Sequence, residues 1–387
     1  MKKNLFINNF ISETKKIYNK DLIPLHNPTF IGNEKKYLSD CIESNYVSSV
    51  GKNVSKFEDK ISKFIGSKYC IATVNGTSAL HMAIKLSGVQ SGDEIITQAL
   101  TFVATCNAIS YSNAKPIFVD VDKDTLGLSP IALNNFLKKN AVKKVSGTYN
   151  KKTGKKIAAC VPMHTFGFPC RIQQICDICE FWNIPVIEDA AESLGSYVEK
   201  KHTGTFSLIA SLSFNGNKII TTGGGGMILT DDPNIANHAK HITTTAKVKH
   251  SFEYIHDEIG YNYRMPNLNA ALGCAQMEFL NEFLIKKKKL ANYWSNFFKQ
   301  NRVNFITPLK KNRANYWLNT IILKSKNERN NFLKYTNKNG VMTRPIWRLM
   351  SELVMYKNCQ NDGLRNSIWL QDRVVNIPSS VPDKFFK

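Results

Sequence analysis

Short apolar runs alternate with helix-type patterns along the chain up to about residue 245. An apolar run of four to eight residues between Gly, Pro, Asn or Asp indicates a buried strand, whereas apolar spacings of three and four indicate a helix. This pattern predicts seven strands, at residues 69–74, 94–97, 116–121, 157–163, 184–188, 209–213 and 227–229. It predicts intervening helices at residues 78–86, 104–110, 130–137 and 172–182.

This alternation is typical of an α/β domain whose mostly parallel, seven-stranded sheet is covered by helices on both faces. The polar stretch 138–156, rich in Lys, Gly and Asn, is expected to be an exposed excursion from that domain. We therefore assign residues 1–245 to an N-terminal segment and a large domain.

The pattern changes beyond residue 245. It predicts a helix at 268–283 that continues into 290–299, strands near 317–323, and a closing helix around 369–375. Residues 246–387 are accordingly predicted to form a smaller C-terminal α+β domain.

The length and apolar content fit a two-domain enzyme that stays in solution. A chain of 387 residues with 43% hydrophobic residues buries a large core. Its apolar runs fall short of the roughly 18 residues that cross a bilayer. Asparagines interrupt the apolar stretch after the basic N-terminus, so we expect no signal peptide and a cytoplasmic protein.

The net charge of +22 is the main argument for another function, because a basic surface attracts nucleic acid. The lysines are spread along the chain, however, apart from local runs such as Lys286 to Lys289, and asparagine is abundant as well. Joint Lys and Asn enrichment is typical of genome-wide compositional bias. We therefore predict neither a nucleic-acid partner nor a membrane partner.

Nine cysteines are an odd number, which favours reduced thiols over a disulfide framework. Cys176 and Cys179 form a C-x-x-C pair without a second pair elsewhere. Because they lie at helical spacing and structural zinc takes four ligands, we predict core packing and no metal.

Lys218 stands in the most informative setting of the chain. It closes the run Ser213-Phe214-Asn215-Gly216-Asn217-Lys218, and four glycines follow shortly after it. About 30 residues upstream, an apolar run ends in Glu188-Asp189. Pyridoxal phosphate requires a lysine for its aldehyde and an acid for its ring nitrogen, so this pairing indicates that cofactor.

The turn at Gly76, Thr77 and Ser78 follows the first predicted strand and begins a helix. Glycine permits close backbone approach, and the free N–H groups of a helix start favour phosphate. The same residues also suit an ordinary helix N-cap. Their combination with Asp189 and Lys218 favours phosphate binding.

Three further residues have two readings each. Asp189 lies where α/β sheets present ligand-binding groups, although an aspartate there also suits an N-cap. Phe102 has the shape to stack on a cofactor ring or to pack in the core. His164 follows a strand and either faces the cofactor or has a structural role.

The motifs that carry these residues resemble the sugar aminotransferases of the DegT/DnrJ/EryC1/StrS family, which have the fold-type I, aspartate aminotransferase-like architecture. The resemblance spans nearly the whole chain, and its most specific motifs are residues 75–80, 101–109, 188–192, 213–218 and 260–267. Other segments are similar to transaminases of legionaminic acid and bacillosamine synthesis, namely residues 46–51, 125–130, 315–319 and 343–347.

The resemblance implies that Lys218 binds the cofactor covalently, that Asp189 pairs with its ring nitrogen, and that Phe102 stacks on its ring. It places Gly76, Thr77 and Ser213 at phosphate positions.

The same resemblance implies that Asn262 reaches the cofactor phosphate in the active site of the neighbouring subunit, and hence that the protein is a homodimer with shared active sites. Glu192 occupies a position near the cofactor's phenolic oxygen where many relatives carry glutamine. Many relatives also carry an acid in the glycine run after the lysine, and this chain has only glycines there.

The implied reaction moves an amino group from glutamate to C4 of a UDP- or GDP-linked 4-keto-6-deoxy-N-acetylhexosamine for bacterial surface glycans. Lys218 is expected to shuttle the proton. One alternative is a dehydratase of the same family, although those enzymes generally carry histidine in place of the lysine. The other is a non-catalytic binding or regulatory relative.

Overall fold

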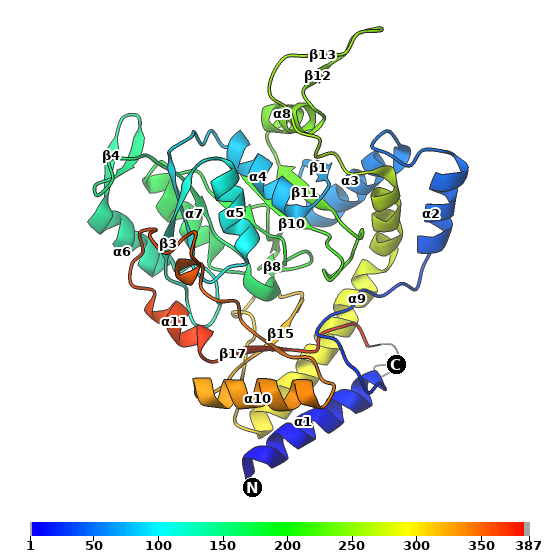
Figure 1. The fold of residues 1–387 in the computed structure, drawn as a ribbon, viewed down its shortest axis with the longest axis vertical. Coiled ribbons are helices and arrows are strands. Elements are labelled where there is room, and N and C mark those ends of the chain that lie inside the picture. Colours follow the sequence, from blue (N-terminus) through cyan, green and yellow to red (C-terminus); the bar gives the residue numbers. More distant parts are fainter. Residues whose placement is uncertain (1, 383–387) are drawn as a thin grey trace.

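A computed structural model describes residues 2–382 (Figure 1). A seven-stranded sheet with helices on both faces fills one half of the molecule. The other half is a smaller layer in which a four-stranded sheet packs near helices from both ends of the chain. The long helix α9, Asn267–Gln300, runs from the large sheet into the smaller layer.

The large sheet has the strand order β3-β2-β6-β7-β10-β11-β1. Two parallel bridges, Cys160 to Val186 and Met163 to Asp189, join its two halves. Only β11 runs antiparallel to its neighbours, so the predicted mostly parallel, seven-stranded sheet is confirmed. The strands are β1 Tyr69–Thr73, β2 Glu94–Gln98, β3 Lys115–Val119, β6 Ile157–Val161, β7 Ile187–Asp189, β10 Ile209–Ser213 and β11 Gly226–Thr230.

Alternate residues of a strand in this sheet belong to separate apolar clusters on opposite faces. Ile95 belongs to a cluster with α4 and α8, whereas its neighbour Ile96 belongs to a cluster with α6 and α7. This period of two explains why both faces need apolar residues and why the strands read as continuous apolar runs. The helices are α4 Gly76–Leu86, α5 Val103–Tyr111, α6 Pro130–Asn140, α7 Ile172–Phe181 and α8 Pro233–Thr243.

The smaller layer contains the N-terminal helix as well as the C-terminal third of the chain. Phe10 of α1 lies 5.2 Å from the rings of both Trp294 and Phe332, which belong to α9 and α10. The division of the chain at residue 245 stays a prediction. The elements are α1 Lys2–Tyr18, β14 Asn304–Phe305, β15 Asn319–Ile322, α10 Lys326–Lys338, β16 Arg344–Pro345, α11 Arg365–Gln371 and β17 Val374–Ile377, while α2 Glu34–Glu43 and α3 Lys52–Ile65 pack on α9.

Two predicted elements differ from the structure. The closing helix expected around 369–375 is wrong in its second half, because α11 ends at Gln371 and residues 374–377 form β17 between β15 and β16. The apolar run there forms a strand that pairs with β15 and β16, which lie far from it in the sequence. This tertiary pairing overrides the local helical pattern. The excursion at 138–156 contains the hairpin β4 Ala141–Lys144 and β5 Gly147–Asn150, and part of β5 is buried.

A narrow arm projects from the large half between α8 and α9 (Figure 1). It contains the short strands β12, Lys247–Val248, and β13, Ile255–His256.

Cys179 packs in the core and Cys176 packs against it, as predicted. Within the described part of the chain, the helices lack the combination of length and apolar character that crosses a membrane.

Candidate active site

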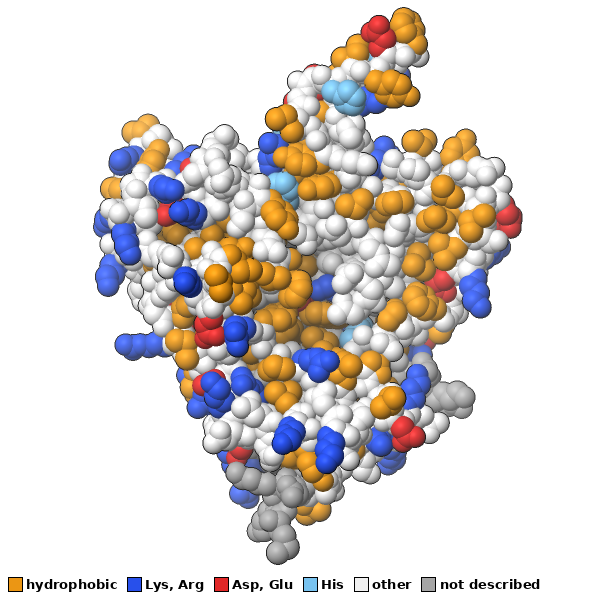
Figure 2. All heavy atoms as spheres, viewed as in Figure 1, with side chains coloured by type: hydrophobic (Ala, Val, Ile, Leu, Met, Phe, Trp, Pro, Cys, Tyr) orange, Lys and Arg blue, Asp and Glu red, His pale blue; other side chains and the backbone are white. Residues whose placement is uncertain are grey.

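A cavity of about 670 Å³ lies where the carboxyl ends of the large-sheet strands face the smaller layer. Figure 2 shows this face of the molecule hollowed near its centre, while Lys and Arg side chains are scattered over it without forming a stripe. Carboxyl ends of parallel strands are the usual ligand site of an α/β sheet. Seven of the predicted residues line the cavity: Gly76, Thr77, Phe102, Asp189, Glu192, Ser213 and Lys218.

Lys218 follows β10 in a tight turn, in which its N–H donates to the Asn215 carbonyl at 3.0 Å. Its Nζ lies 3.4 Å from Oε1 of Glu192 and 3.9 Å from the centre of the Trp317 ring. The Lys218 side chain is 14% exposed, so its amine faces the cavity rather than bulk solvent. An amine in this position can attack an aldehyde held in the cavity.

Asp189 ends β7 and is buried at the floor of the cavity. Thr105 donates to its Oδ2 at 2.8 Å, and the Ala191 N–H donates to its Oδ1 at 3.2 Å. Burial raises the pKa of the Asp189 carboxyl, and these two hydrogen bonds oppose the rise. A cation placed beside this carboxylate would favour its charged form.

Glu192 is also buried, and the Phe166 N–H donates to its Oε2 at 2.8 Å. Burial raises the pKa of Glu192 to about 7, even though Lys218 acts in the opposite direction. Near neutral pH this carboxyl can therefore hold a proton and donate it to a cofactor oxygen.

The phosphate candidates lie at the start of α4. Asn75 caps the helix by accepting from the Ser78 N–H at 2.8 Å, which leaves the first-turn N–H groups of Gly76 and Thr77 without a helical acceptor. A Cβ on Gly76 would stand 2.7 Å from Cβ of Ser213, so glycine is needed for this close approach. A small anion fits this set of N–H and hydroxyl donors.

Ser78 and Asn262 do not line the cavity of their own chain. Ser78 is buried in the first turn of α4, where its N–H serves the Asn75 cap. Asn262 pairs with Thr244 in the segment that follows the projecting arm. The contact of Asn262 with a neighbouring subunit stays a prediction.

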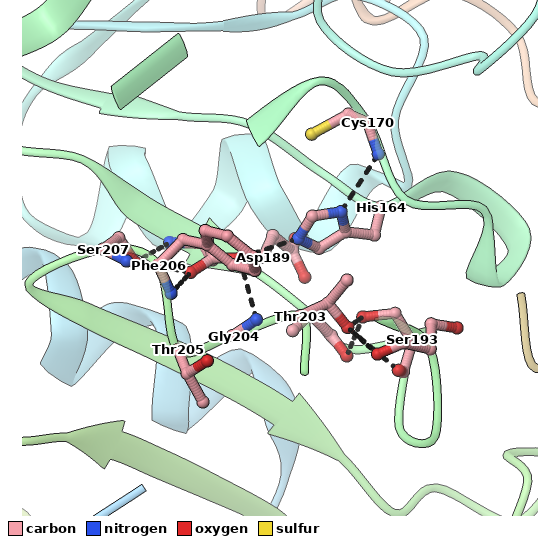
Figure 3. Close-up of polar contacts among 12 residues, drawn as sticks. His164, Cys170, Asp189, Ser193, Thr203, Gly204, Thr205, Phe206 and Ser207 are labelled. Atoms are coloured by element: carbon pink, nitrogen blue, oxygen red, sulfur yellow. Dashed lines mark hydrogen bonds and ion pairs between the residues drawn. The ribbon is translucent and has the colours of Figure 1, made fainter. Parts of the chain in front are cut away.

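Phe102 precedes α5 and is 49% exposed at the cavity, with its ring 6.0 Å from that of Trp347. His164, by contrast, is fully buried away from the cavity. Its Nδ1 accepts from the Cys170 N–H at 3.2 Å, as Figure 3 shows, and its Nε2 lies 2.9 Å from Glu188. The structural reading of His164 therefore holds.

Sequence reasoning gave no role to several residues that shape the cavity. Thr105 holds Asp189, Trp317 supports Lys218, and Arg344, Trp347 and Arg348 line the cavity from the smaller layer. All of them lie in or beside the segments quoted for the resemblance. Those segments pointed to the residues, but only the folded chain brings them to the cavity.

The chain has clear relatives. The model of the DegT/DnrJ/EryC1/StrS aminotransferase family matches residues 28–382. GDP-perosamine synthase of Escherichia coli O157:H7 is 35% identical over 364 residues, which cover 92% of this chain and 93% of that one. UDP-2-acetamido-2-deoxy-3-oxo-D-glucuronate aminotransferase of Pseudomonas aeruginosa is 32% identical over 252 residues, 65% of each chain. Among solved structures, Helicobacter pylori PseC, an aminotransferase involved in the biosynthesis of pseudoaminic acid, superposes with a TM-score of 0.83 at 22% identity over 92% of this chain and 93% of that one.

The fold and the cavity together define a fold-type I enzyme whose residues fit pyridoxal phosphate. The sequence match is more specific than the fold. The chain belongs to the DegT/DnrJ/EryC1/StrS aminotransferase family, and it is an aminotransferase that depends on pyridoxal phosphate.

Proposed function

We propose that this enzyme moves an amino group from glutamate to C4 of a UDP- or GDP-linked 4-keto-6-deoxy-N-acetylhexosamine, in the synthesis of a bacterial surface glycan. The observation that carries the proposal is the meeting of Lys218, Asp189 and Glu192 in one cavity that the smaller layer lines with arginines. Relatives named for GDP-perosamine and for a UDP-linked oxo sugar support a nucleotide-linked substrate.

When bound, the cofactor supplies a ring that accepts electrons from the bond broken at the amino carbon. Asp189 would hold the proton on the ring nitrogen, since an ionised carboxylate favours a cationic neighbour. Glu192 would hold a proton toward the phenolic oxygen. Lys218, once its amine is free, would act as the general acid and base that moves a proton between the cofactor's C4′ and the amino carbon of the substrate, C4 in the sugar.

Arg344 and Arg348 supply the positive charge that anionic substrates need at this cavity. Arg344 makes hydrogen bonds only to neutral groups, to Asn337 at 3.3 Å and to the Thr343 carbonyl at 3.5 Å, as far as residues 2–382 show. Carboxylates of glutamate and the diphosphate of a nucleotide sugar both suit a guanidinium. We therefore assign substrate recognition to the segment that contains β16.

The test compares wild-type protein with Lys218→Ala. Wild-type protein should be yellow with bound cofactor, should lose that absorbance on addition of glutamate, and should then aminate a UDP- or GDP-linked 4-keto sugar. Lys218→Ala should lose the covalent linkage and the amination while keeping its fold. A wild-type protein that responds to glutamate but releases water from the sugar instead would favour the dehydratase alternative.

A further inference from the structure

Lys287 is a fully buried lysine without a carboxylate partner among residues 2–382. It lies in the middle of α9, in the lysine run 286–289, and its side chain is 0% exposed. Its neighbours in the run remain at least partly accessible. Burying an amine costs free energy unless its hydrogen bonds are made, so the position of Lys287 needs a reason.

The Lys287 amine ties together three chain segments that are far apart in sequence. It donates to the carbonyl of Ser379 and, at 3.3 Å, to the carbonyl of Trp317, and its Nζ lies 2.9 Å from Nε2 of His26. All three partners are neutral or can be neutral. Burial lowers the pKa of the Lys287 ammonium, which weakens the case for a charged role.

One of these partners leads directly to the site. The indole N–H of Trp317 donates to the Asn217 carbonyl at 2.6 Å, one peptide before Lys218, and the same ring lies against the Lys218 amine. Asn315 fixes the other side of Trp317 by accepting its backbone N–H at 2.8 Å. The backbone of Trp317 is thus fixed on both sides: the Asn315 side chain accepts its backbone N–H, and Lys287 donates to its backbone carbonyl.

We propose that Lys287 is a positioning residue for Lys218, which it orients by fixing the backbone and hence the indole of Trp317. The inference rests on the proposed role of Lys218 as the attachment site of the cofactor. A mobile Trp317 ring would let the Lys218 amine turn away from the cavity. Loss of a group that orients a reacting side chain slows the chemical step, and therefore lowers kcat, more than it weakens substrate binding.

The experiment uses the full-length, cofactor-loaded enzyme and the variants Lys287→Met and Trp317→Phe. The matched control is Lys289→Met, an exposed lysine of the same run. The main readout is the pH titration of the visible absorbance that reports the linkage between Lys218 and the cofactor. The second is the division of the effect between kcat and KM, and thermal melting checks that each variant folds.

We expect Lys287→Met to shift the linkage titration and to lower kcat about tenfold, as the loss of one buried hydrogen bond does, with little change in KM. Trp317→Phe should act similarly, and the double variant should show less than the sum of the two effects because both act on one contact. Lys289→Met should match the wild type.

A folded Lys287→Met protein whose titration and kcat equal those of Lys289→Met would overturn the proposal. If Lys287→Met does not fold, Trp317→Phe decides, since an unchanged titration in that variant contradicts the same chain of contacts. The titration needs no sugar substrate. A wild-type enzyme with an intact linkage but no sugar turnover would therefore count against the proposed substrate, not against Lys287.

Discussion

Glu192 combines burial, a neighbouring amine and a pKa of about 7 in the cofactor-free structure. A carboxyl whose pKa is raised on folding stabilises the protein fully below its unfolded pKa and loses that contribution as pH rises through the folded value. The cofactor-free wild type should therefore lose stability relative to Glu192→Gln between about pH 4 and pH 7, by on the order of 3 kcal/mol. Denaturant unfolding at several pH values measures the difference, and parallel curves for the two proteins would contradict it.

Asp189 differs from Glu192 in its hydrogen-bonding partners and in its proposed task. Asp189→Asn keeps the size of the side chain but removes the negative charge, so the ring proton of the bound cofactor loses its partner. We expect kcat to fall by about 10²-fold or more, in line with the loss of a proton-holding group, while the cofactor still binds. Thr105→Val serves as the milder comparison, because it removes only the hydrogen bond to Oδ2. Equal kcat values for Asp189→Asn and the wild type would exclude the role.

Helix α1 holds the smaller layer together from the opposite end of the chain. Phe10 is fully buried between α9 and α10, whereas Leu5 of the same helix is 61% exposed. Phe10→Ala should lower the free energy of unfolding by about 3–5 kcal/mol through lost burial and a cavity. Leu5→Ala should change it by about 0.5 kcal/mol or less. Comparable unfolding midpoints for the two variants would show that α1 contributes little to the smaller layer.

The arm that contains β12 and β13 projects from the large half of the molecule (Figure 1), and Asn262 follows it in the sequence, paired with Thr244. If Asn262 serves the site of a second copy, a mixed dimer of Lys218→Ala and Asn262→Ala subunits contains one site with both residues intact. Mixing the two inactive variants and allowing subunit exchange should restore about a quarter of the wild-type activity, since half of the dimers are mixed and each has one good site. Activity that stays at the level of the separate variants would contradict a shared site.

Local sequence patterns predicted much of the fold and the residues at the centre of the site. Apolar runs between turn residues located all seven strands of the large sheet, and the strand ends placed Asp189 and Lys218 at one edge of it. The same local reasoning failed at 374–377, where pairing with β15 and β16 overrides a helical pattern. It also assigned Ser78 to the phosphate and left His164 undecided, because a helix N-cap and a buried histidine–carboxylate contact have the same residue types as a binding site.

The sequence by itself determined the family, the cofactor and seven of the residues that line the cavity, because each depends on short motifs that are local in the sequence. Only the tertiary structure decided what surrounds Lys218. Trp317 and Lys287 lie roughly 100 and 70 residues further along the chain, and Arg344 lies further still. Their contacts arise from the packing of the smaller layer against the large sheet, which no periodicity within either segment records.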